Sequence, residues 1–158
     1  MENKKTDQRY LRLIRFCGEE LYPIQTATWQ YQEGHEDSNE LWLEINAGPG
    51  MQLSDDTKSL NGQPHWELTV RAEKLDLAAL KSGFKAEIPI GYDEESGENL
   101  TNFYYCEHDP SDNNQLEILE KQGNRILFRI SGEVGDVNYY DGSKPVNKIL
   151  VEAWFEEA

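Results

Sequence analysis

The chain has 158 residues, a length that favours one domain able to bury a core of its own. Thirty Asp and Glu residues against fifteen Lys and Arg residues give a formal net charge of −15. This charge argues against nucleic acid and anionic membrane surfaces as partners, because both need a basic protein face. It permits a basic protein partner, since opposite charges steer encounter, and at the least it keeps the chain in solution.

Compartment and domain limits follow from simple features of the chain. No apolar run reaches the length of a membrane span, and the first residues lack the apolar segment of a secretory signal. Cys17 and Cys106 are too few for a disulfide scaffold and are expected to be reduced thiols of a cytoplasmic protein. We expect residues 1–9 to be a mobile polar lead and residues 10–158 to form a single β-rich domain.

The first half of the chain predicts strands. Tyr10–Phe16 alternates in polarity and indicates a strand, either packed on both sides or at an edge protected by Arg; a helix stays open, because Leu and Arg are good helix formers. Residues 17–25 contain glycine and proline and predict a loop. Residues 26–32 and 41–45 alternate cleanly on either side of an acidic turn, which predicts a hairpin.

A long segment without periodicity follows. Residues 46–64 are rich in glycine and proline, and a loop of this length is uncommon in a compact domain. It is either functional or it contains a short strand near residues 51–53. Residues 65–73 then show the cleanest alternation of the chain, with Trp66 and Leu68 on its apolar side, and predict a half-buried strand.

The middle of the chain contains the one predicted helix. Residues 76–82 begin with the capping residue Asp76 and are rich in Leu and Ala, so they favour a short helix. Residues 84–90 alternate, but Pro89 cannot donate to a ladder and indicates an edge strand. Residues 91–99 predict an acidic loop. They are followed by a strand over residues 101–106 and a polar turn over residues 107–114.

The last third of the chain is the most apolar. Residues 116–120 and 125–130 flank a Gly- and Asn-containing turn, which predicts a hairpin, and residues 148–155 predict one more strand. Gly132 is expected to break or bulge the second strand of the hairpin. The pattern predicts a mainly β fold, an antiparallel β-sandwich or open barrel of about eight strands with one short helix; the alternative is an α+β roll.

Acidic side chains are concentrated between Lys85 and Lys121. This stretch holds ten Asp and Glu residues and neither Lys nor Arg. Solvated loops are the ordinary explanation of such a run, and an acidic docking surface is the functional one. Adjacent tyrosines in the loop before the last strand add rings of the kind found at protein contacts. The predicted partner-binding residues are Asp93, Glu94, Glu95, Glu98, Glu107, Asp109, Asp112, Tyr139 and Tyr140.

Metal and catalytic motifs are absent from the sequence. The acidic run at residues 93–98 lacks the ligand spacing of a calcium loop. Cys106 and His108 are of zinc-ligand type, but a structural zinc site needs four ligands and only these two are close in sequence. No nucleophile elbow, phosphate-binding loop, dinucleotide fingerprint or zinc-protease motif occurs. We therefore expect no metal, no cofactor and no enzymatic activity.

Three functional hypotheses follow from these features. The leading one is a non-catalytic acidic protein that docks a basic protein partner, in the manner of an inhibitor or immunity protein. The second is a carbohydrate-binding β-sandwich that uses exposed rings such as Trp42 or Tyr140. The third is a structural domain without a small-molecule ligand. No nucleic acid or membrane partner is expected, and the oligomeric state is not indicated by the sequence.

Overall fold

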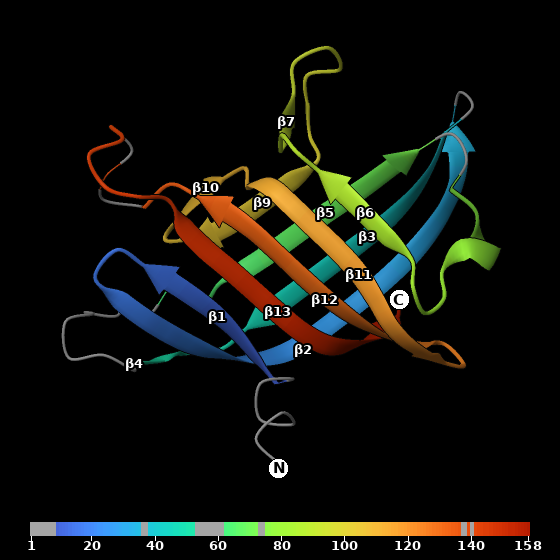
Figure 1. Cartoon of the computed structure of the whole chain (residues 1–158), viewed down its shortest axis with the longest axis horizontal. Coiled ribbons are helices and arrows are strands. Elements are labelled where there is room, and N and C mark those ends of the chain that lie inside the picture. Colours follow the sequence, from blue (N-terminus) through green and yellow to red (C-terminus); the bar gives the residue numbers. More distant parts are fainter. Residues whose placement is uncertain (1–8, 36–37, 53–61, 73–74, 137–138, 140) are drawn as a thin grey trace.

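The computed structural model describes residues 9–35, 38–52, 62–72, 75–136, 139 and 141–158, and it confirms a mainly β fold made of antiparallel sheets (Figure 1). Residues 1–8, which make up most of the predicted polar lead, lie outside the described residues. The strands are β1 (Tyr10–Arg15), β2 (Gly18–His35), β3 (Ser38–Ala47), β4 (Met51–Gln52), β5 (His65–Ala72), β6 (Lys85–Ile88), β7 (Tyr92–Asp93), β8 (Glu98–Asn99), β9 (Thr101–Tyr105), β10 (Glu107–Asp109), β11 (Asp112–Gln122), β12 (Arg125–Val134) and β13 (Asn147–Glu157).

One large sheet contains most of these strands. Its order is β10–β9–β5–β3–β2–β1–β13–β12–β11–β6, with β4 attached to β2, while β7 and β8 form a separate two-stranded sheet. In Figure 1, strands β11, β12 and β13 cross in front of β2, β3 and β5, so the sheet folds over itself into two layers. β10 and β6 remain at its two ends, and the sheet does not close into a barrel. This arrangement fits the predicted sandwich.

Strand β2 belongs to both layers. Its first half pairs with β1 and its second half with β3, and the pairing register shifts between Ile24 and Thr26. Because side chains alternate along a strand, this bulge changes which ones face the core: Tyr22 is buried before it and Trp29 after it. The loop predicted over residues 17–25 is wrong, because this segment pairs with β1 and β4.

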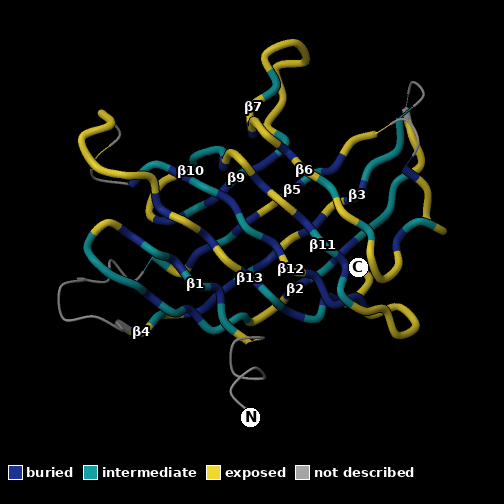
Figure 2. The backbone as a smooth tube through the Cα atoms, in the orientation of Figure 1, coloured by how far each residue is buried: buried dark blue, intermediate teal, exposed yellow. Residues whose placement is uncertain are grey.

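The core lies between the two layers. Buried and exposed residues alternate along most strands, as Figure 2 shows. The rings of Phe128 and Phe155 meet edge to face with centroids 5.0 Å apart. Gly132 admits the ring of Trp66, because a Cβ at this position would lie 2.9 Å from that ring. The irregularity expected at Gly132 lies instead on β11, between Asp112 and Gln115, while β12 keeps continuous pairing with β13.

The other predicted elements are present in modified form. The helix expected over residues 76–82 is a single 3-10 turn, η1 (Leu77–Ala79), and the carboxylate of Asp76 caps it by accepting a hydrogen bond of 2.8 Å from the backbone N–H of Ala79. Cys17 and Cys106 are not bonded to each other.

Among the described residues, no helix has the length and apolarity needed to cross a membrane.

The structure has more strands than the roughly eight predicted from local patterns. β4 is the short strand considered near residues 51–53. The additional ones, β7, β8 and β10, contain two or three residues each, which is too short for alternation to be visible in the sequence. The prediction of an acidic loop over residues 91–99 is wrong in part, because β7 and β8 pair within this segment as a hairpin. The hairpin projects from the top of the molecule in Figure 1.

Candidate functional site

The outer face of β2, β3, β5 and β9 carries a row of polar side chains. Each strand directs one set of residues into the core and the alternate set outward. The pairing register places outward-facing residues beside one another, from Thr28 on β2 through Glu44 and Glu67 to Asn102 on β9. The same alternation that builds the core therefore assembles a polar surface across four strands.

This surface is hollowed. A hollow of about 520 Å³ lies over the four strands, and a second of about 560 Å³ lies between β3 and the hairpin β7–β8. Trp42 lines both, so the two hollows are neighbours, and together they are here called the acidic groove. Its outward-facing lining side chains are those of Thr28, Gln30, Gln32, Glu33, Glu40, Trp42, Glu44, Glu67, Thr69, Arg71, Ser96, Glu98, Asn99, Asn102 and His108.

The charge of the acidic groove is strongly negative. Five glutamates line it, and among its described lining residues Arg71 is the one Lys or Arg. Hydrogen bonds from Arg71 to Glu40 and Glu98 raise the pKa of its guanidinium. Its Nε lies 2.6 Å from Glu40, and its Nη2 lies 2.7 Å from Glu98. Arg71 thus ties the hairpin to β3, and the groove keeps an excess of carboxylates.

Trp42 supplies an aromatic surface at the centre of the acidic groove. Its side chain is 43% exposed, whereas Trp29 and Trp66 are buried. Its indole Nε1 donates a hydrogen bond of 2.8 Å to Glu40, which fixes the ring beside a carboxylate. An exposed ring next to acidic groups suits the stem and charge of a Lys or Arg side chain, and it also suits a sugar face.

The predicted hairpin acids are brought to one edge of this groove. Glu98 lines the groove, and Asp93, Glu94 and Glu95 lie on the same hairpin. Asp93 also has a structural role, because its carboxylate accepts hydrogen bonds from the backbone N–H of Glu95 (3.1 Å) and from Ser96 Oγ (2.9 Å). The acids at the turn are therefore held on an ordered tip.

The predicted acids at β10 and β11 lie elsewhere. Glu107 and Asp109 line a small hollow next to Val134, away from the acidic groove. Burial, together with the charges of Asp112 and Glu107, raises the pKa of Asp109. Asp112 accepts a hydrogen bond of 2.8 Å from the backbone N–H of Gly91, at the base of the hairpin. Asp112 thus supports the hairpin, and none of the three acids is among the residues that line the groove.

Tyr139, the described member of the predicted tyrosine pair, is not among the residues that line the acidic groove either. Tyr139 is 36% exposed and packs edge to face on Phe16, with ring centroids 5.1 Å apart. The ammonium of Lys144 lies 5.6 Å from the Tyr139 ring centroid. Tyr140 lies outside the described residues. Glu40, Glu44 and Glu67 were not predicted from the sequence. Glu40 and Glu44 flank Trp42 on the polar side of its strand, which was a usable signal, and Glu67 joins them through the β3–β5 register.

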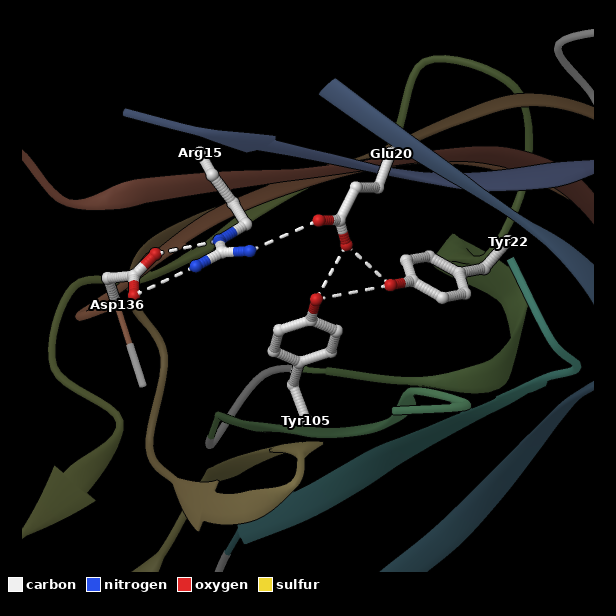
Figure 3. Close-up of polar contacts among 5 residues, drawn as sticks. All are labelled: Arg15, Glu20, Tyr22, Tyr105 and Asp136. Carbon is white, nitrogen blue, oxygen red and sulfur yellow. Dashed lines mark hydrogen bonds and ion pairs between the residues drawn. The ribbon is translucent and has the colours of Figure 1, made fainter. Parts of the chain in front are cut away.

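A second polar centre lies inside the protein, between β1, β2, β9 and the segment after β12 (Figure 3). Arg15 donates from Nε to Asp136 at 2.8 Å and from Nη1 to Glu20 at 3.2 Å. The hydroxyls of Tyr22 and Tyr105 both donate to the same oxygen of Glu20. Burial of Arg15 opposes its charged form, but the hydrogen bonds and charges of its partners, first Asp136 and then Glu20, together raise the pKa of Arg15.

This buried network is closed to a ligand. Arg15 is 7% exposed, and Glu20 and Asp136 are less exposed still. Arg15 pairs with both carboxylates and Glu20 also accepts from two tyrosine hydroxyls, so the network holds the β1–β2 turn against the loop that follows β12. The side chains of the acidic groove, by contrast, lie at the surface and are open to a ligand.

Comparisons of the chain with protein-family models, with curated proteins and with solved structures give no match.

Proposed function

We propose that this protein is a non-catalytic binding protein that holds a basic protein partner in the acidic groove, in the manner of an inhibitor or immunity protein. The main support is the imbalance of charge: five glutamates line the groove, and Arg71 is already paired with two of them. Such a surface accelerates encounter with a basic partner, and Trp42 adds a ring on which a Lys or Arg side chain can stack.

The hairpin beside the groove supports the same proposal. It projects from the sheet and exposes Tyr92 by 43%, and the adjoining Ile90 is 65% exposed. Apolar side chains bordered by charged ones are typical of protein contacts, in which a few anchors provide most of the affinity. The proposal includes a cytoplasmic location, which suits a protein whose two thiols are not bonded to each other.

The experiment is capture of partners from the lysate of the source organism by the tagged protein, followed by binding kinetics with each purified partner. Glu44→Lys/Glu67→Lys is expected to slow association by about tenfold or more at low salt, because it reverses two charges inside the groove. Glu94→Lys/Glu95→Lys, on the hairpin tip, is expected to have a smaller effect of the same sign.

The matched control is Glu87→Lys/Glu120→Lys, which makes the same change of net charge at two exposed positions outside the acidic groove. This variant is expected to keep most of the association rate. If high salt releases a partner and all three variants slow its association equally, the attraction is due to net charge alone. The groove would then be rejected as the binding surface.

Carbohydrate binding is the second candidate, and the exposure of Trp42 favours it. The ring lies among amide and hydroxyl side chains, including those of Asn99 and Thr69, which hydrogen-bond to sugars. A ligand stacked on Trp42 should change the tryptophan fluorescence, and Trp42→Phe should remove that change. A flat response of the native protein across a glycan panel would reject this candidate.

A further inference from the structure

Three side chains of metal-ligand type converge on the outer face of the sheet. Glu44 projects from β3, and His65 and Glu67 project from β5, two residues apart and therefore on the same side. One ligand atom from each lies within 4.8 Å of the other two. Nε2 of His65 is 3.0 Å from a carboxylate oxygen of Glu44 and 3.6 Å from one of Glu67. We call these three residues the Glu–His–Glu cluster.

The two carboxylates of this cluster face each other without a permanent positive charge between them. Glu44 and Glu67 are directly opposite across the β3–β5 ladder, a position at which like charges destabilise a sheet. Within the described part of the chain, neither forms an ion pair with Lys or Arg, and their shared partner is His65.

From this arrangement we propose that the Glu–His–Glu cluster binds one divalent transition-metal ion of the zinc class. An imidazole nitrogen together with two carboxylate oxygens is a donor set that such ions prefer, whereas calcium and magnesium favour oxygen donors alone. A metal ion would place two positive charges where the two carboxylates oppose each other. Both glutamates line the hollow of the acidic groove, so the remaining coordination positions face solvent or a bound partner.

This site differs from the metal ligands considered from the sequence. Cys106 and His108 belong to no group of three ligand-type side chains among the described residues. The proposal also does not rest on the proposed partner, because the metal alone tests it. A failure of zinc binding and a failure of partner binding would therefore be separate results.

The test is calorimetric titration of the native chain with zinc chloride, and with calcium and magnesium chloride in parallel. We expect one saturable zinc site and no comparable calcium or magnesium site. His65→Gln and Glu44→Gln/Glu67→Gln should each weaken zinc binding at least tenfold, because each removes direct ligands. His108→Gln is the matched control: it removes a histidine that lines the same hollow but lies outside the cluster, and it should leave the affinity unchanged.

Two further measurements guard against misfolding and against zinc bound by thiols. Without metal, Glu44→Gln/Glu67→Gln should melt at or above the temperature of the native chain, because it removes a like-charge pair. Zinc should raise the melting temperature of the native chain but not that of Glu44→Gln/Glu67→Gln. Cobalt substituted at the site should show visible absorption without the near-ultraviolet thiolate band. Absence of a saturable zinc site, or zinc affinity unchanged by His65→Gln, would overturn the proposal.

Discussion

Replacement of Arg15 by Met is expected to lower the free energy of unfolding by about 3–5 kcal/mol, the usual cost of breaking a buried ion pair from one side. Met retains an apolar stem of similar length but has no guanidinium, so the carboxylates of Asp136 and Glu20 would lose their buried positive partner. The desolvation of both carboxylates, which are 1% and 0% exposed, would then be poorly offset. Urea denaturation followed by circular dichroism measures the change.

The control for this experiment lies on the same strand. Arg12 faces outward from β1, and its Nη1 lies 3.5 Å from Glu19; the two side chains are 35% and 42% exposed. Because surface ion pairs contribute little to stability, Arg12→Met is expected to lower the free energy of unfolding by no more than about 1 kcal/mol. Equal losses in the two variants would mean that the Arg15 network is not the buried centre that stabilises this end of the fold.

Replacement of Asn114 by Ala is expected to lower the free energy of unfolding by about 2–4 kcal/mol, through lost buried hydrogen bonds and a small cavity. Asn114 is fully buried. Its Nδ2 donates to the carbonyls of Ile88 (2.9 Å) and Ser111 (2.7 Å), and its Oδ1 accepts from Ser111 Oγ at 2.7 Å. Ser111 Oγ in turn accepts from the indole of Trp66. Asn114 thus joins β6, the start of β11 and the core.

Gln115→Ala is the appropriate comparison, since Gln115 is the exposed neighbour of Asn114 on β11. This substitution is expected to lower the free energy of unfolding by less than about 0.5 kcal/mol. The Asn114 variant should also loosen the base of the hairpin β7–β8, because the backbone carbonyl of Ser111 accepts from Thr101 Oγ1, directly after that hairpin. Faster amide exchange at Gly91 and Leu100 would report this loosening. Unchanged stability and exchange would show that the network is dispensable.

Local pattern was sufficient for strands that alternate strictly. His65–Ala72 buries one side against the core, and so does most of residues 125–130 at the start of β12, and a period of two shows this in the sequence. The continuation of β12 past Gly132 was not predicted. The first half of β2 was missed, because its place depends on pairing with β1 and on the bulge after Ile24, and a composition with glycine and proline favoured a loop. Such pairing depends on contacts between different segments of the chain, which the pattern within one segment does not show.

In the candidate sites, too, features set by local pattern were predicted and features set by pairing between distant segments were not. The sequence indicated that Trp42 lies on the polar side of its strand and that Glu98 is exposed, and both line the acidic groove. The Glu–His–Glu cluster could not be predicted from the sequence, because Glu44 and His65 are 21 positions apart and meet only through the β3–β5 register. Asp136 is 121 positions from Arg15, and no local feature marked either residue as buried.

The two ends of the large sheet bear on self-association. Its terminal strands are β10, with three residues, and β6, with four, and each is followed at once by a proline, Pro110 or Pro89. Most residues of these strands are charged, and proline cannot extend a ladder. A second copy would find only a short, charged edge to add to, so the open sheet carries its own protection against edge-to-edge stacking into fibrils.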